Sequence, residues 1–286
     1  MPIVEPSWLI SGNILYFHYG HQGLNDKGWG CAYRSLQCLL SFFSLNHYVD
    51  MRVPSIPEIQ QVLVDIGDKP ASFVNSREWI GSQEVGYVLG SLLDIDCKYI
   101  IIEKGSEAKK YMNQLRDHFM NQATPVMIGG GVLAFTCIGI SIHPKTQDAK
   151  LLILDPHYTG KDEVKSILSE KQRLEGYFGF GCSWKTLKEV FKASEFYRLC
   201  LPQRPFAYLF VCCTNTDEVV EVVVAFYKTI RDSGFDSWRS DSFPLPSRSL
   251  SSRQSPYWHS AAARLSPRPT SSTNGLFTNP WNLHCM

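Results

Sequence analysis

An α+β fold is predicted for this chain by the order in which its apolar patterns occur. Helical periodicity dominates the early part of the chain, and continuous apolar runs typical of buried strands cluster later. With 286 residues, of which 44% are hydrophobic, the chain is long enough to bury a full core. We therefore expect an N-terminal helical part followed by a later antiparallel sheet.

Three helices are expected in the early part, after a short strand at ILYFH (14–18). The first is predicted to begin at Cys31, because apolar residues then recur with the spacing of one helical stripe. These residues are Ala32, Leu36, Leu39, Leu40 and Phe43. Pro57 is typical of the first turn of a second helix. The third is expected over 85–92, where apolar residues again share one face.

Strand and helix candidates alternate in the later part. Strands are expected at 98–103 and 149–158, helices at 105–122, 161–170 and 184–192, and an apolar run at 205–213 closes the compact part. The segment 125–142 has 18 uncharged residues, which is near the lower limit for a membrane span. Because Gly129–Gly131 interrupt it, we expect two buried strands around a bend instead.

Three regions are predicted from the change in composition along the chain. Residues 1–214 form the compact domain, and 215–232 are an extension of uncertain character. Residues 233–286 are rich in serine, proline and arginine, and such sequence buries too little apolar surface to offset its ordering entropy. We expect this tail to be disordered.

Charge and cysteine usage exclude several classes of partner. The chain has 28 Lys and Arg against 27 Asp and Glu, so no net field favours nucleic acid or an anionic membrane. Nine cysteines without a C-x-x-C pair suggest neither a disulfide framework nor a zinc ribbon. The N-terminus lacks the basic stretch of a secretory signal. We expect a monomeric cytoplasmic protein without a metal site, a cofactor or a membrane span.

The stretch GWGCAYRSLQ (28–37) places Cys31 between glycines and a predicted helix. Unpaired N–H groups and the dipole at a helix N-terminus favour a thiolate, which is the nucleophilic form of cysteine. The preceding glycines allow a sharp turn and leave room for a substrate chain beside the sulfur. Cys31 is thus a candidate nucleophile, although cysteines near helix starts are often plain core residues.

Asp155-Pro156-His157 supplies the partners that a thiol nucleophile needs. If the strand continues through this segment, residues i and i+2 project to the same face, so Asp155 would orient His157 while His157 takes the proton of Cys31. The alternative is a turn that merely ends the strand. The other histidines compete poorly: His18 and His21 lie in the loop before Cys31, and none has a carboxylate at matched spacing.

Aromatic residues near Cys31 have candidate roles in binding. Tyr19 heads the loop that leads to Cys31, so its hydroxyl and the Cys31 N–H are candidate donors to an oxyanion. A packed aromatic is the alternative for Tyr19. Trp29 is expected either to wall a narrow channel beside the thiol or to cap the core.

Five motifs together resemble the proteases specific for ubiquitin-fold modifier 1. They are GWGCAYRSLQ, REWIGSQEV (77–85), PVMIGGGVLA (125–134), ILDPHYTG (153–160) and FYRLCLPQRP (196–205). Their order and spacing match the family from about residue 12 to residue 206. The resemblance implies a papain-like cysteine peptidase fold. It also implies a thiol protease that trims the modifier precursor after its terminal glycine and removes the modifier from conjugated proteins.

Roles for individual residues follow from the same resemblance. It implies that Cys31 is the nucleophile, His157 the base, Asp155 the orienter and Tyr19 the oxyanion donor. Trp29 and Gly30, together with Trp79 and Ser82 of the second motif, are expected to seat the substrate. A tunnel beside Gly28 and Gly30 would admit only a chain without side chains at its scissile end. Trp79 and Ser82 are equally compatible with a structural role.

The chain departs from the longer family form in several places. We expect no counterpart of the N-terminal domain of that form in this sequence, so recruitment to the endoplasmic reticulum has no support from it. Phe135 replaces an expected histidine, Gly181 replaces a tryptophan, and the segment around 171–183 is longer.

Two rival functions stay open from the sequence. An autophagin-type protease shares the G-W-G-C and D-P-H motifs but acts on another ubiquitin-like protein; the continuations A-Y-R-S-L-Q and H-Y-T-G favour the first family. A non-catalytic module that only holds the modifier tail is the second rival, and Phe135 and the lost tryptophan are its support.

Overall fold

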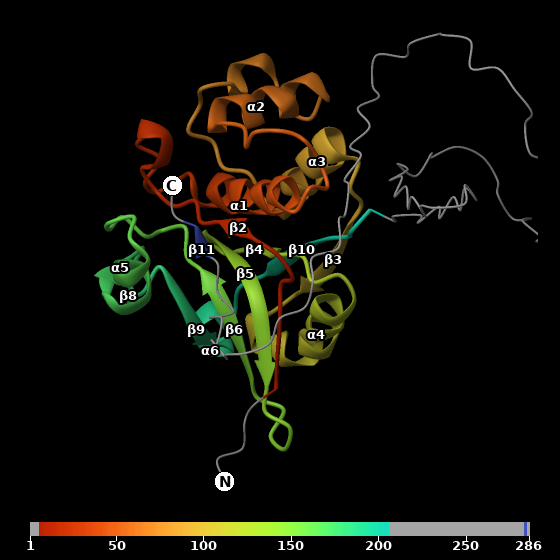
Figure 1. Cartoon of the computed structure of the whole chain (residues 1–286), viewed down its shortest axis with the longest axis vertical. Coiled ribbons are helices and arrows are strands. Elements are labelled where there is room, and N and C mark those ends of the chain that lie inside the picture. Colours follow the sequence, from red (N-terminus) through yellow and green to blue (C-terminus); the bar gives the residue numbers. More distant parts are fainter. Residues whose placement is uncertain (1–5, 206–282, 285–286) are drawn as a thin grey trace, which may run out of the picture. The chain divides into compact units, whose positions relative to one another are not determined.

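The computed structural model describes residues 6–205 and 283–284 (Figure 1). Its centre is a seven-stranded sheet in the order β3-β10-β4-β5-β6-β9, with β1 beside β5, and every pairing in it is antiparallel. The strands are β1 (Ser7–Leu9), β3 (Cys97–Ile102), β4 (Val126–Gly130), β5 (Leu133–Ile142), β6 (Ala149–Leu154), β9 (Cys182–Thr186) and β10 (Tyr197–Pro202). The predicted α+β class with a later antiparallel sheet is confirmed.

Helices cover the sheet in two groups. The early helices α1 (Cys31–Leu45), α2 (Ile56–Asp65) and α3 (Ser82–Leu93) lie together in Figure 1. They share one hydrophobic core with sheet residues such as Met127 and Leu152. The later elements η3 (Gly105–Tyr111), α4 (Met112–Asn121) and α6 (Leu187–Val190) share a second core with residues such as Ile128 and Ile153. Neighbouring strand residues enter different cores because side chains alternate between the faces of a sheet.

The first helix begins at Cys31, as its apolar stripe predicts. It is buried on nearly all sides, so its polar residues need partners. Arg34 and Asp26 are both fully buried, and the guanidinium Nε lies 2.7 Å from Oδ2 of Asp26. This ion pair fixes the loop before Cys31 to the first turn of α1, since the Gly30 N–H also donates to the Asp26 carbonyl at 2.8 Å.

The second and third helices also agree with the sequence. Ser55 caps α2 in a capping box with Glu58, and Pro57 lies in its first turn. The α3 helix covers the predicted range 85–92. The apolar segment 125–142 forms the two strands β4 and β5 around a bend, as expected. Among the described residues, no helix has the length and apolar character needed to span a membrane.

Several element predictions are wrong in part. The helix expected at 105–122 begins as the 3₁₀ segment η3 and becomes α-helical only at Met112. The helix expected at 184–192 is limited to the short α6 at 187–190, because residues 182–186 form the strand β9 and pair with β6. The strand expected at 14–18 is limited to β2 (Ile14–Leu15), which pairs with β11 (Leu283–His284).

Other differences concern the ends of elements and the region after residue 205. The helix expected at 161–170 is the shorter α5 (Val164–Ser169), and a hairpin of β7 (Gln172–Arg173) and β8 (Phe178–Gly179) follows it. The strand β10 was not expected, although it pairs with both β3 and β4. The apolar run at 205–213 lies almost wholly outside the described residues, as do the extension and nearly all of the predicted tail.

Candidate active site

Asp155, Pro156 and His157 form a turn directly after β6 rather than the end of the strand. The expectation that strand alternation aligns Asp155 with His157 is therefore wrong. The turn itself brings them together, since Oδ1 of Asp155 accepts the His157 backbone N–H at 3.2 Å and lies 2.7 Å from Nδ1. A carboxylate accepts only, so Nδ1 carries a proton, and Nε2 is the nitrogen that can exchange a second proton with a neighbouring group.

The turn is fixed from both sides by backbone contacts. The Asp155 N–H donates to the Gly181 carbonyl at 2.7 Å, and the Tyr16 hydroxyl donates to the Asp155 carbonyl at 2.5 Å. The Tyr19 N–H donates to the Pro156 carbonyl at 2.9 Å. The chain segment before Cys31 is thereby tied to the segment that carries His157.

The Asp155 carboxylate is fully buried and has two further partners. Its Oδ2 lies 2.7 Å from Nζ of Lys185 and accepts a hydrogen bond from the Tyr177 hydroxyl. Burial alone would raise the pKa of Asp155, but the hydrogen bond and charge of His157 and the charge of Lys185 outweigh it, so the pKa is lowered. Asp155 is consequently a carboxylate at neutral pH.

Lys185 and Tyr177 are site residues that the sequence reasoning missed. Lys185 is only 5% exposed, and its Nζ lies 4.5 Å from the ring centre of Tyr177 and 5.3 Å from that of Phe135. Tyr177 belongs to the segment around 171–183, which forms the β7–β8 hairpin. The sequence of β9, CSWKT, has no apolar alternation that would mark Lys185 as buried, so no local signal was available for this contact.

The His157 side chain is buried against two aromatic rings. The Tyr19 ring meets it edge to face at a centroid distance of 5.4 Å, and the Phe135 ring does so at 5.5 Å. Burial lowers the pKa of His157, but the contacts with Asp155 and with Cys31 outweigh this and raise it to about 9. Nε2 makes no hydrogen bond of ordinary geometry within the described part of the chain, although Cys31 lies close enough to act on its pKa. Such contacts often tighten only when substrate binds.

Cys31 and Tyr19 complete the group. Cys31 is the first residue of α1 and its side chain is half-buried, so the sulfur borders solvent and the unpaired N–H groups of the first turn. Burial and the nearby Cys31 sulfur raise the pKa of Tyr19 well above its usual value. Its hydroxyl therefore keeps its proton and is available as a donor beside the sulfur.

A cleft of about 640 Å³ opens at Cys31. Residues that line it include Trp29, Trp79, Ser82, Gly129–Gly131, Val132, Glu195, Phe196 and Arg198. Trp79, Val132 and Phe196 are large apolar residues with 55%, 59% and 41% of their surfaces exposed. Exposed apolar groups around a cleft are typical of a surface that binds another molecule.

Three of the four expected substrate-binding residues line this cleft, and Gly30 does not. A Cβ on Gly30 would lie 2.2 Å from Oδ2 of Asp26, so the glycine makes room for the buried Asp26 carboxylate. Gly28 has a φ of +84°, which permits the turn before Cys31. Ser82 lines the cleft but is buried, and its hydroxyl donates to the Arg198 carbonyl at 2.5 Å.

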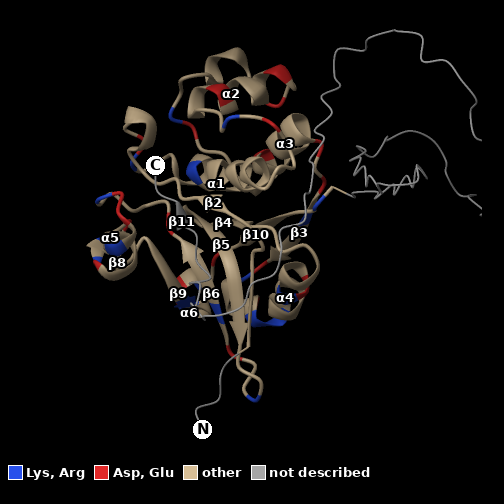
Figure 2. Cartoon of the chain, viewed as in Figure 1, with Lys and Arg blue, Asp and Glu red and all other residues tan. Residues whose placement is uncertain are grey.

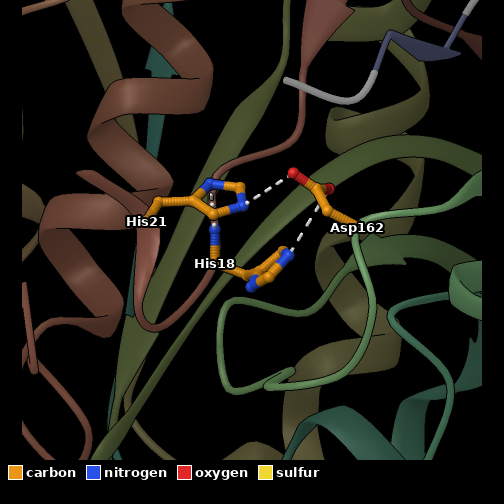
Figure 3. Close-up of side chains that lie close together, drawn as sticks. All are labelled: His18, His21 and Asp162. Carbon is orange, nitrogen blue, oxygen red and sulfur yellow. Dashed lines mark hydrogen bonds and ion pairs between the residues drawn. The ribbon is translucent and has the colours of Figure 1, made fainter. Parts of the chain in front are cut away.

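A second polar cluster includes His18, the residue directly before Tyr19 in the chain. Asp162 reaches both His18 and His21, which the sequence reasoning had left without a carboxylate partner (Figure 3). Burial lowers the pKa of His18, and burial together with the charge of His18 lowers the pKa of His21 to about 4. The distance of Asp162 along the sequence left no signal for this contact.

The arrangement of a helix-start cysteine beside a histidine, with an antiparallel sheet that carries the histidine and its carboxylate, defines a papain-like cysteine peptidase fold. The profile of peptidase family C78 matches residues 6–200, and the chain belongs to this family. The chain is 47% identical over 198 residues to Ufm1-specific protease 2 of Gallus gallus and 45% identical over 196 residues to the Ufm1-specific protease of Caenorhabditis elegans.

These alignments cover 69% and 68% of this chain but only 41% and 32% of the two relatives, so the chain spans well under half of their length. Among solved structures, the crystal structure of UfSP from C. elegans superposes with a TM-score of 0.61 at 40% identity. That match covers 72% of this chain and 35% of the C. elegans chain.

Proposed function

We propose that this chain is a thiol protease that cleaves the precursor of ubiquitin-fold modifier 1 after its terminal glycine and removes the modifier from conjugated proteins. The observation that carries the proposal is the contact of Cys31 with a buried His157–Asp155 pair beside an open cleft. The relatives supply the substrate, because they are named as proteases specific for this modifier.

The geometry supports a two-step acyl transfer. His157 Nε2 takes the thiol proton of Cys31, and the thiolate attacks the carbonyl carbon of the terminal glycine. The Cys31 N–H and the Tyr19 hydroxyl donate to the oxygen that becomes negative. The imidazolium then gives its proton to the leaving amine, which yields a thioester. Water, deprotonated by His157, hydrolyses the thioester and restores the thiol.

The same residues serve precursor processing and deconjugation. In the precursor the leaving group is the amine of the next residue, and in a conjugate it is the amine of a lysine side chain. Both reactions break an amide bond after the same glycine. A site that recognises the modifier's tail and protonates an amine therefore handles both, provided the open end of the cleft accepts a protein on the leaving side.

A modifier with a C-terminal glycine vinyl sulfone tests nucleophile and substrate together. The wild type is expected to form a covalent adduct, and Cys31→Ser is expected to form none. Cys97→Ser, which removes another partly exposed thiol, is the matched control and retains labelling. An unlabelled wild type that still binds the modifier would favour the non-catalytic module instead. Cleavage of the ubiquitin-like precursor on which autophagins act, without cleavage of the precursor of ubiquitin-fold modifier 1, would favour an autophagin-type protease.

The expected preference for glycine at the scissile end rests on the cleft wall. The backbone of Gly129–Gly131 lines one side of the cleft and Trp29 lines it near Cys31. A substrate in which valine replaces the last glycine would bring a branched side chain against these walls, so cleavage is expected to stop. Retained cleavage of the valine substrate would reject this account.

A cytoplasmic location and a monomeric state are further parts of the proposal. They are supported by the composition: nine cysteines without a C-x-x-C pair, and near-equal numbers of basic and acidic residues. Figure 2 shows those charges interspersed over the described helices and loops. Cell fractionation and light scattering test the two statements. Recovery with secreted proteins, or a dimer mass, would contradict them.

A further inference from the structure

His18, His21 and Asp162 bring their polar atoms together at a point where two distant chain segments meet (Figure 3). The Nε2 atoms of His18 and His21 lie 3.7 and 3.2 Å from the two oxygens of Asp162. All three side chains offer one ligand atom, and these atoms lie within 4.8 Å of one another. The proposed catalytic mechanism uses none of them.

The tautomer of His18 makes this cluster unusual. Its Nδ1 lies 3.0 Å from the Tyr19 carbonyl oxygen, which only accepts, so Nδ1 carries the proton of the neutral ring. The Nε2 lone pair then faces an oxygen of Asp162. His18 is only 3% exposed, and its Nε2 has no hydrogen-bond partner among the described residues. Two acceptors that face each other in a buried position repel unless a cation lies between them.

The spacing fits a small divalent ion. A tetrahedral zinc ion with ligand bonds of about 2.0–2.1 Å holds its ligand atoms roughly 3.3 Å apart. The 3.7 and 3.2 Å separations, which involve different oxygens of Asp162, lie on either side of that value, and all three ligand atoms lie within 4.8 Å of one another, so a modest contraction completes the site. A backbone carbonyl that accepts from the second ring nitrogen, as for His18, is the usual outer contact of a metal-bound histidine. Two imidazoles and one carboxylate form a ligand set that leaves a fourth position for water.

His21 requires one adjustment. Its Nδ1 accepts a long hydrogen bond of 3.4 Å from the His18 backbone N–H, so the neutral ring carries its proton on Nε2 when no ion is bound. Metal binding through Nε2, which points at Asp162, moves that proton to Nδ1 and costs this long hydrogen bond. His21 and Asp162 retain 15% and 26% of their side-chain exposure, so an ion has a path from solvent.

The surroundings favour an ordered site. The rings of Tyr16 and Tyr158 lie 5.1 and 5.0 Å from that of His18, which excludes water from its inner side. The positive Arg34 is close, where it donates to the His21 carbonyl at 2.8 Å, but its charge is balanced by the buried Asp26. The carboxylate of Asp162 then compensates half the charge of a divalent ion.

We propose that His18, His21 and Asp162 bind a divalent transition-metal ion of the zinc type. The ion ties the segment that carries Tyr19 to the segment that follows His157, and so holds the two sides of the active site together. His18 precedes Tyr19 directly, and its Nδ1 also contacts the Tyr19 carbonyl oxygen. The bound ion would therefore fix the backbone of Tyr19, the proposed oxyanion donor. Metal binding does not depend on the proposed peptidase activity and is measured without any modifier.

Titration of the full chain with Co²⁺, followed by visible absorption, tests the site. Cobalt bound by nitrogen and oxygen atoms gives ligand-field bands without the sulfur-to-cobalt charge-transfer band that a thiolate site at Cys31 would give. The wild type is expected to bind one equivalent of Co²⁺ with such nitrogen- and oxygen-ligated bands that Asp162→Asn and His21→Gln do not bind at the same cobalt concentration. Their affinity is expected to fall by at least about 100-fold, because even outer contacts of metal ligands are typically worth 10- to 100-fold.

Matched variants and a thermal readout complete the experiment. Asp148→Asn and His47→Asn change exposed residues outside the cluster and are expected to bind like the wild type. Zn²⁺ at about 100 times its Kd is expected to raise the wild-type melting temperature by about 5 °C or more and to leave both cluster variants unchanged. Equal cobalt binding by wild type and both cluster variants, or spectra with sulfur charge transfer only, would overturn the proposal.

Discussion

Nζ of Lys185 lies 2.7 Å from Oδ2 of Asp155, while Nδ1 of His157 lies 2.7 Å from Oδ1 of the same carboxylate. Each oxygen thus has its own charged or polar partner. The lysine comes from β9, an edge strand that pairs with β6, and Asp155 follows the end of β6. Because both oxygens are held, the carboxylate cannot rotate away from the imidazole, and the orientation of the proposed base depends on a strand far from Cys31 in sequence.

Lys185→Met is predicted to be strongly destabilising. Methionine fills a similar volume but leaves Oδ2 of the buried Asp155 with only the Tyr177 hydroxyl. Removal of one partner of a buried ion pair typically costs about 3–5 kcal/mol. Urea unfolding of wild type and variant measures the loss. Lys109→Met, which breaks an exposed ion pair with Asp148, is the control and is expected to unfold like the wild type. Equal unfolding midpoints for Lys185→Met and Lys109→Met would contradict the structural role given to Lys185.

The raised pKa of His157 predicts a loss of stability and activity at alkaline pH. The folded-state pKa is about 9, against about 6.5 in an unfolded chain. A raised folded pKa means that the contribution of His157 is fully present below about pH 6.5 and is lost as pH rises through about 9. Since the charged imidazolium protonates the leaving amine, kcat/KM on the modifier precursor is expected to fall over the same upper range.

Asp155→Asn tests the cause of that pH dependence. The amide no longer stabilises the imidazolium, so the alkaline fall in kcat/KM is expected at a lower pH, with reduced activity throughout. If kcat/KM of Asp155→Asn falls at the same alkaline pH as that of the wild type, a group other than His157 causes the fall. The contribution of His157 to stability is measured separately from catalysis. It is the difference in melting temperature between the wild type and His157→Gln across the same pH range.

Tyr19→Phe is predicted to lower kcat by about 10²- to 10³-fold, which is the usual effect of one lost oxyanion donor. KM and the rate of Cys31 alkylation by a small uncharged reagent are expected to change little, because neither needs the oxyanion contact. Tyr48→Phe removes the hydroxyl of a partly exposed tyrosine that stacks on Phe42, and serves as the control. A parallel loss of alkylation and kcat would show that Tyr19 supports the thiol itself rather than the oxyanion.

The sequence predicts local features of this fold well and distant contacts poorly. The start of α1 at Cys31 and the bend between β4 and β5 follow from apolar spacing and from glycines, which act within a few residues. The strand β10, next to the edge of the sheet, is not predicted, because its place between β3 and β4 is set by pairing with segments far away in the chain. Strand propensity depends on such neighbours, which a sequence does not display.

The same distinction applies to the site. Asp155 and His157 are two residues apart, so their pairing was foreseeable, although a turn and not a strand produces it. Lys185 reaches Asp155 from 30 positions away, and Asp162 meets His18 across the molecule. Gly30 was assigned to the substrate because it adjoins Cys31, whereas its neighbour in space is Asp26. Residues that are close in sequence thus predict the chemistry of the site. The residues that support it from distant parts of the chain are not predicted.

Trp79→Ala is predicted to weaken binding of the modifier without slowing the chemical step. The indole is 55% exposed at the cleft, where a folded substrate would cover it, so we expect it to contribute equally to binding of the substrate and of the transition state. Removal of an aromatic contact at an interface typically costs more than about 1 kcal/mol, so KM is expected to rise by about 10-fold at unchanged kcat. Ile101→Ala removes another exposed apolar side chain, on β3 outside the cleft lining, and should leave both constants unchanged. If kcat falls while KM is constant, Trp79 acts on the geometry of Cys31 rather than on binding, and the modifier surface must be sought elsewhere around the cleft.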